Sequence, residues 1–99
     1  MDERKQAVIH PKCWKDVDDA YEYILRESPK QANILREQFL ETVGDIQRMP
    51  TRGMIYRDDI RKTKLGKFRY GVYYREEADR IEILGIHHER RGTIFNVAM

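Results

Sequence analysis

The sequence has few of the features that mark secreted, membrane-spanning or metal-binding proteins. Its 99 residues contain one cysteine, Cys13, so no intramolecular disulfide can form and a reducing compartment is expected. No apolar run approaches the roughly 18 residues that a membrane-spanning helix needs. Residues 1–6 contain no apolar segment of the kind found in signal peptides. We therefore expect a soluble, cytoplasmic protein.

Histidine is scarce as well, which limits both metal binding and acid–base chemistry. The three histidines are His10, His87 and His88. Adjacent residues on a strand point to opposite faces, so His87 and His88 cannot hold one ion together. We expect no metal and no cofactor. His88, next to a Glu-Arg-Arg run, is the one side chain suited to acid or base catalysis near neutral pH.

Positive charge is concentrated in the second half of the chain. Residues 1–50 hold 8 basic and 10 acidic side chains, whereas residues 51–99 hold 11 basic and 7 acidic ones. Six of the fifteen residues from Arg61 to Arg75 are Lys or Arg, and none is acidic. Such a stretch suits an anionic partner, although a solvated face has the same composition. Composition alone leaves the partner open.

The first half of the chain predicts one strand and a helical hairpin. Residues 7–10 are rich in β-formers and stop at Pro11. From Lys12 to Glu27 apolar residues recur every three or four positions, which predicts an amphipathic helix with Cys13 as a small buried thiol. Ser28-Pro29 then supplies an N-cap and a first-turn proline for a second helix, which should end near Met49-Pro50.

The second half switches to short strand-like runs separated by turn residues. The predicted strands are residues 60–65, 68–75 and 80–88, joined by a two-residue turn at Gly66-Lys67 and a longer turn at residues 76–79. The predicted fold is α+β with the order β-α-α-β-β-β, a helical hairpin packed on one face of a small curved antiparallel sheet. We expect a single domain over residues 1–99, with its core in residues 7–91 and a tail at 92–99.

These turns also predict which residues share a face of the sheet. They place Lys64 opposite Arg69 and Tyr74 opposite Ile81, and directly opposed residues lie on the same face. One face should pack on the helices through Leu65, Phe68, Tyr70, Val72, Tyr74, Ile81 and Ile83. The other face should bind a partner through Lys62, Lys64, Arg69, Tyr73, Leu84, Ile86 and His88, with Arg90 and Arg91 beside them. Leu84 and Ile86 would then need a cover, either the tail or a partner.

Five short motifs in this order resemble one known family. They are Ala20-Tyr21-Glu22-Tyr23-Ile24, Ser28-Pro29-Lys30-Gln31-Ala32, Met49-Pro50-Thr51-Arg52-Gly53, Phe68-Arg69-Tyr70-Gly71-Val72-Tyr73-Tyr74 and Ile86-His87-His88-Glu89-Arg90-Arg91. The chain resembles the RelE/ParE superfamily of bacterial toxins over about residues 7–91, and it is most similar to the ParE branch. The resemblance implies a toxin of a type II toxin-antitoxin system, with a cognate antitoxin as partner in a hetero-oligomer.

Two targets are compatible with the resemblance. ParE-like members inhibit DNA gyrase, contribute to plasmid stabilisation and are not known to need a catalytic residue. RelE-like members cut messenger RNA on the ribosome, and the corresponding set here would be Lys62, Lys64, Arg69, His88 and Arg91. The tail has no Tyr, a residue that many of these nucleases carry there, which favours gyrase. A third possibility is a nontoxic nucleic-acid-binding module.

Overall fold

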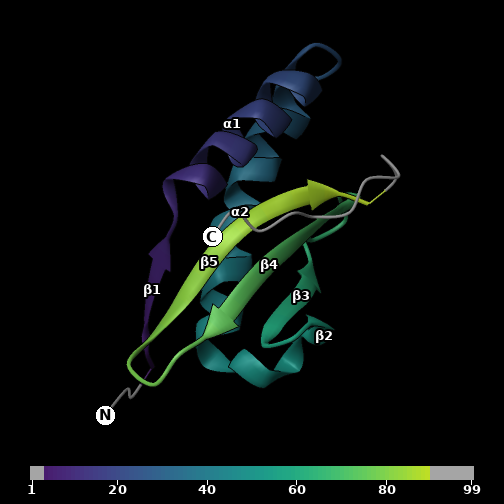
Figure 1. The fold of residues 1–99 in the computed structure, drawn as a ribbon. Helices are drawn as coiled ribbons and strands as arrows, with labels where there is room; N and C mark the ends of the chain where they lie inside the picture. The colour runs from purple at the N-terminus through teal and green to yellow at the C-terminus, as the bar shows by residue number, and fades with distance from the viewer. Residues whose placement is uncertain (1–3, 90–99) are drawn as a thin grey trace.

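Two helices pack on one face of a five-stranded sheet (Figure 1). The computed structural model describes residues 4–89. The elements in chain order are β1 (Gln6–Ile9), α1 (Pro11–Leu25), α2 (Pro29–Arg48), a 3-10 turn η1 (Pro50–Arg52), β2 (Met54–Arg57), β3 (Ile60–Lys64), β4 (Tyr70–Glu76) and β5 (Arg80–His88). The predicted α+β class and order of elements are confirmed. The sequence prediction missed the short strand β2.

The two helices begin where the sequence predicts. Pro11 stands at the first position of α1, and the carbonyl of His10 accepts the backbone N–H of Cys13 at 2.9 Å. The Ser28 hydroxyl accepts the N–H of Gln31 at 3.2 Å, which satisfies one of the free donors at the start of α2. Because only three residues separate α1 from α2, the helices form an antiparallel hairpin (Figure 1).

The strand order is β1-β5-β4-β3-β2, which places β5 between β1 and β4. The pairs β5–β4, β4–β3 and β3–β2 are antiparallel, as predicted for the C-terminal strands. β1 instead runs parallel to β5, with Gln6 opposite Arg80, so the sheet is mixed and not wholly antiparallel. No local turn joins these two strands, and therefore no sequence signal fixed their relative direction.

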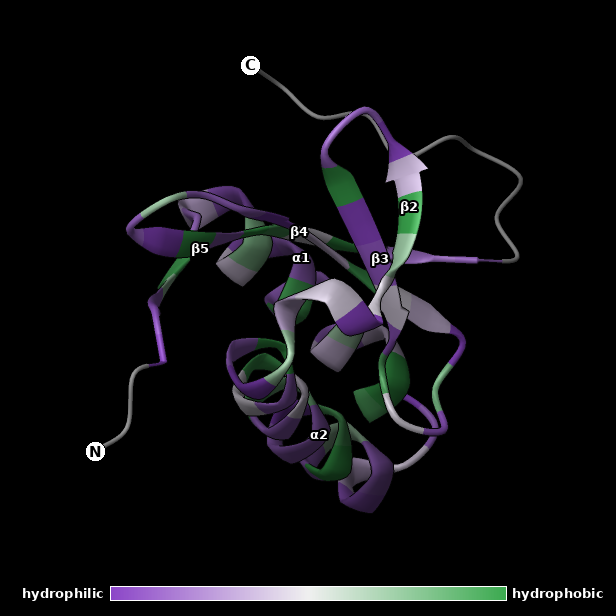
Figure 2. Ribbon diagram, turned by 90° about the horizontal axis from the view of Figure 1, so that it is seen from below, coloured by the Kyte–Doolittle hydropathy of each residue, from purple (hydrophilic) through white to green (hydrophobic). Residues whose placement is uncertain are grey.

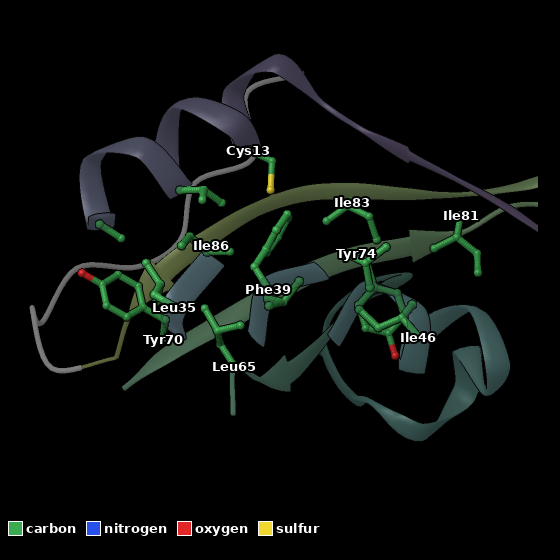
Figure 3. Close-up of a cluster of buried hydrophobic side chains, with 14 residues drawn as sticks. Cys13, Leu35, Phe39, Ile46, Leu65, Tyr70, Tyr74, Ile81, Ile83 and Ile86 are labelled. Atoms are coloured by element: carbon green, nitrogen blue, oxygen red, sulfur yellow. The ribbon is translucent and has the colours of Figure 1, made fainter. Parts of the chain in front are cut away.

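The main core lies between the helical hairpin and the inner face of the sheet, which we define as the face that the helices cover. Ile81 and Ile83 of β5, Tyr74 of β4 and Phe39 of α2 are buried there (Figure 3). Val72 of β4 is buried in the same cluster. Cys13 of α1 joins this cluster and is fully buried, so the prediction of a buried thiol is confirmed. Within residues 4–89, no helix has the length and hydrophobicity of a membrane span.

The turn between β3 and β4 is longer than predicted. The N–H of Leu65 donates to the carbonyl of Tyr70 at 2.9 Å, so four residues and not two form the loop. Gly66 sits in this loop with φ 51°, a conformation that glycine adopts at little cost. The register therefore shifts by two residues, and Thr63 lies opposite Val72 instead of Tyr70. A two-residue shift keeps every side chain on its predicted face, because strand side chains alternate with a period of two.

Candidate partner-binding surface

A one-residue bulge in β5 decides which of its side chains can reach a partner. Tyr74 pairs with Ile83 but Tyr73 pairs with Gly85, so Leu84 is an extra residue in β5. An odd shift reverses the faces of all later residues in the strand. Ile86 therefore lies opposite Val72 and is buried in the main core at 4% exposure. The prediction that Ile86 lies uncovered on the outer face is wrong.

The bulge also moves His88. This residue lies opposite Tyr70, and the two rings meet edge to face with centroids 4.9 Å apart. Tyr70 belongs to the main core, so His88 lies at the margin of the inner face. The prediction that His88 lies beside Lys62 and Lys64 on the outer face is wrong. By strand alternation, His87, paired with Gly71, takes the outer position. Gly85, an isolated glycine inside a strand pattern, was the local signal for a bulge, and the sequence prediction did not use it.

The outer face has a small apolar cluster of its own. Ile60, Tyr73 and Leu84 are buried together, with Tyr56 packed against them. The rings of Tyr56 and Tyr73 meet edge to face at 4.9 Å, and burial raises the pKa of Tyr73 to about 12, with Tyr56 and Glu89 adding to the effect. Leu84 is only 3% exposed. Leu84 lies on the predicted outer face, but the prediction that it is left uncovered there is wrong. Tyr73, which is buried beside it, offers little surface to a partner.

The predicted basic residues separate into two places. Lys62 lies opposite Tyr73 and Lys64 opposite Gly71, so both point to the outer face of β3. The predicted pair of Lys64 and Arg69 does not form, because the longer turn includes Arg69 and leaves it outside the paired residues of β4. In this turn the carbonyl of Arg69 accepts the N–H of Glu89 at 2.9 Å. Arg90 and Arg91, together with the tail 92–99, lie outside the described residues.

Lys62 and Lys64 line a surface hollow that we name the cationic hollow. It has a volume of about 270 Å³ and is lined by Arg52, Gly53, Met54, Lys62, Thr63, Lys64 and Glu89. Three of these side chains are positive and one is negative, so the hollow suits an anionic group. Arg52 was not predicted as a site residue, although it belongs to the motif Met49-Pro50-Thr51-Arg52-Gly53.

The position of Arg52 depends on a hydrogen-bonded clasp around the 50–53 turn. The hydroxyl of Tyr74 donates to the carbonyl of Pro50 at 2.7 Å and accepts the N–H of Gly53 at 3.0 Å. Arg61 donates to the carbonyls of Thr51 and Gly53 at 3.1 and 2.8 Å. A Cβ atom at Gly53 would collide with the Tyr74 hydroxyl, which explains the glycine in this motif. The clasp connects the end of α2 to the start of β2.

A second depression shares Arg52, Gly53, Thr63 and Lys64 with the cationic hollow. It also measures about 270 Å³ and lies between the C-terminal half of α2 and β3. Its lining includes Glu41 and Asp45 of α2 together with Arg52 of η1 and Lys64 of β3. The depression thus has acidic and basic side chains, and it shares the two basic ones with the cationic hollow. Arg52 and Lys64 therefore face two adjoining depressions.

Charge is divided along the sheet as well as between its faces. Residues 51–75, which include β2, β3 and most of β4, contain eight Lys or Arg and two Asp, for a net charge of +6. Residues 76–89, which include β5, contain five acidic residues and one Arg, for a net charge of −4. The cationic character predicted from the sequence thus belongs to the β2–β3 side of the sheet. Acidic partners are attracted to that side.

β2 combines this charge with exposed apolar side chains. Met54 is 71% exposed and Ile55 is 57% exposed, among the highest values for large apolar residues in the described part of the chain. Figure 2 shows this hydrophobic segment at the margin of the molecule, beside hydrophilic residues of β3. A short run of β-formers followed by Asp58-Asp59 was the sequence signal for this strand.

Cys13 and the possible metal ligands were the other candidates for chemistry among residues 4–89. Burial raises the pKa of the Cys13 thiol to about 12, and Asp16 adds to this shift, so the thiolate nucleophile is suppressed. Within residues 4–89, no three His, Cys, Asp or Glu side chains are close enough to hold a metal ion. Of the nuclease residues expected within 4–89, Lys62 and Lys64 line the cationic hollow, whereas Arg69 and His88 are not among its lining residues.

Comparison with known proteins agrees with this fold. The family model for the ParE toxin of the type II toxin-antitoxin system parDE matches residues 7–92. A solved chain from the chromosomal ParDE toxin-antitoxin system of P. aeruginosa is 20% identical, with a TM-score of 0.75 over 88% of this chain and 98% of that one. No curated protein matches the chain. Because the family model covers most of its length, the chain belongs to the ParE toxin family of type II toxin-antitoxin systems.

Proposed function

We propose that this ParE family member inhibits DNA gyrase and that a cognate antitoxin neutralises it in the cytoplasm. The position of His88 is the observation that carries the choice of target. A ribonuclease of the related RelE type would need His88 beside the phosphate-binding cations, but His88 pairs with Tyr70 at the margin of the inner face. A toxin that acts by binding a protein needs no such general base.

Gyrase inhibition is testable with the purified chain. We expect micromolar protein to reduce the supercoiling of relaxed plasmid by gyrase and to leave relaxation by a type I topoisomerase unchanged. The double variant Lys62→Glu/Lys64→Glu should weaken inhibition at least tenfold if the cationic hollow contacts the target. A matched control is Lys12→Glu/Lys15→Glu, which makes the same charge change on α1. Unchanged supercoiling at micromolar wild-type protein would exclude gyrase as the target.

Messenger RNA cleavage is the competing activity, and the net charge of +6 in residues 51–75 is the observation that favours it. The test is toeprinting of ribosome-bound message with the wild type, His88→Ala and Arg69→Ala. Cleavage that disappears in both variants while their folds survive would replace gyrase inhibition by nuclease activity. A third outcome is binding to free DNA or RNA that weakens steeply with salt, as expected of a nontoxic nucleic-acid-binding module.

Neutralisation has a test of its own. The reading frame next to this one should encode a short protein with an acidic segment and a DNA-binding part. Coexpression should yield a stable complex in which the melting temperature of the toxin rises, because a ligand that binds only the folded state stabilises it. The same complex should restore plasmid supercoiling. A neighbouring protein that forms no complex would contradict this part of the proposal.

A further inference from the structure

Among the described strands, the edge strand β2 carries the most exposed apolar side chains. The strand order of the described residues ends at β2, so one side of its backbone faces no further strand. Open edges can pair with a strand from another chain. Met54 and Ile55 are 71% and 57% exposed on this edge, whereas Leu84 and Ile86 of the interior strand β5 are buried. A partner thus gains more apolar contact at β2 than over β5.

The charge around β2 selects the kind of strand that can join it. Residues 51–75 carry a net charge of +6, so a second copy of this chain would bring two strongly positive ribbons together. Like charge at an edge is a known protection against self-pairing, whereas an acidic strand would be attracted. The chemistry therefore favours an acidic partner over a second copy.

Register indicates which side chains such a strand should carry. Met54 pairs with Lys62 and so lies on the outer face, next to the cationic hollow formed by Arg52, Lys62 and Lys64. Ile55 pairs with Arg61 and so lies on the inner face. An added strand alternates in the same way. Its outer residues should be acidic, to meet the hollow, and the residue beside Ile55 should be apolar.

We propose that an extended segment of a protein partner, with acidic and apolar residues in alternation, adds to the open edge of β2 and places a carboxylate in the cationic hollow. This rests on the proposed function, which requires a protein partner, and it moves the contact from β5 to β2. The affinity comes from backbone hydrogen bonds and from burial of Met54 and Ile55, and the hollow fixes the register.

The test uses a synthetic peptide and not the natural partner, so it is independent of gyrase. The full chain, labelled with nitrogen-15, is titrated with acetyl-Glu-Val-Glu-Val-Glu-Val-Glu-amide to millimolar concentration and followed by amide chemical shifts. We expect the largest shifts at Met54 and Ile55, with smaller ones at Lys62 and Lys64. A Lys-Val peptide of equal length should not bind. A Glu-Val peptide with a central Pro should bind at least fivefold more weakly, because Pro removes a backbone donor.

A pair of matched variants separates the edge from general surface effects. Ile55→Glu introduces a negative charge that repels the acidic peptide at the edge, and it should weaken binding of the Glu-Val peptide at least fivefold. Leu40→Glu makes the same change at a residue of α2 that is 58% exposed, and it should leave binding unchanged. Both residues are exposed, so both variants should keep their thermal unfolding midpoint within a few degrees of wild type.

Several results would overturn the proposal. One is the absence of chemical-shift changes at millimolar peptide, and another is a set of changes centred on the helices. A third is equal binding of the Glu-Val and Pro-containing peptides, which would indicate attraction by charge alone. Chemical-shift changes at β2 that depend on protein concentration and not on peptide would show that a second copy of the chain pairs with this edge. A chain that inhibits gyrase and ignores the peptide overturns this inference alone. A chain that binds the peptide and leaves gyrase unaffected overturns only the proposed target.

Discussion

β5 and β2 are both rich in apolar residues, yet their side chains have opposite fates. Ile81 and Ile83 of β5 are fully buried, whereas Met54 and Ile55 of β2 are among the most exposed apolar residues described. β5 lies between two strands and beneath α1, but β2 ends the sheet. Position in the strand order, more than local hydrophobicity, therefore decides which residues form the core and which remain available to a partner.

The largest expected effect is a pair of truncations that contrasts the two strands. Ile83→Ala should lower the free energy of unfolding by about 2–4 kcal/mol, because it leaves a cavity in a packed core. Ile55→Ala should change it by less than about 0.5 kcal/mol, since that side chain is more than half exposed. Urea denaturation of both variants measures the difference. Equal losses would mean that β2 is as deeply packed as β5.

The clasp on the 50–53 turn is where the core holds β2 in place, and it gives the next largest effect. Tyr74→Phe removes the hydroxyl bonded to Pro50 and Gly53, and should cost about 1–3 kcal/mol. Gly53→Ala should cost a similar amount, about 1–3 kcal/mol, because its Cβ would collide with that hydroxyl.

A double-mutant cycle checks that these two effects share one cause. Gly53→Ala/Tyr74→Phe should cost less than the sum of the single variants, because the phenyl ring leaves more room for the new methyl group. Additive losses in urea denaturation would show that the glycine is needed for some reason other than the hydroxyl.

Cys13 packs in the same core as β5, and we expect it to have a moderate effect on the free energy of unfolding at high pH. Its pKa is raised from about 9 in the unfolded chain to about 12 in the folded protein, so the folded state favours the protonated thiol. The resulting stability is present below pH 9 and is lost as the pH rises from 9 toward 12. Cys13→Ala should flatten this decline, measured by urea denaturation at several pH values. An identical slope in both proteins would contradict the assignment.

The smallest effect is expected in the turn that ends β2. Asp58 has φ 52°, a left-handed conformation in which a side chain costs energy. Asp58→Gly should therefore stabilise the protein slightly or leave it unchanged, within about 1 kcal/mol. Asp58→Val should destabilise it, because a β-branched residue is poorly tolerated there. Thermal unfolding of the two variants gives the order directly, and a more stable Asp58→Val would show that the turn rearranges.

Much of the fold follows from local signals that survive in the structure. The Ser28-Pro29 start of α2, the spacing of apolar residues in both helices and the three C-terminal strands were all predicted correctly. The inner positions of Val72 and Tyr74 were also predicted, even though the turn at Gly66 was assigned two residues too short. An error of two residues in register does no harm, because strand side chains alternate with a period of two.

The candidate surface was predicted less well, because single-residue events control it. The extra residue Leu84 turned Ile86 and His88 from the outer to the inner face, and the neighbouring Gly85, a weak bulge signal, was not used in the prediction. Lys62 and Lys64 were placed on the correct face, but Arg52 was missed because a clasp formed with Tyr74 and Arg61 brings it to them. Contacts between residues that are distant in the chain have no local signature.

Local signals in the chain specify the helices, most of the strands, the buried thiol and the positive charge of the second half. These depend on propensity, capping, periodicity and composition, which act over a few neighbouring residues. Only the tertiary structure decided that β1 runs parallel to β5, that β2 forms the open edge and that the bulge buries Ile86. The physical reason is that strand order, direction and register depend on hydrogen bonds between distant segments, which local preferences do not specify.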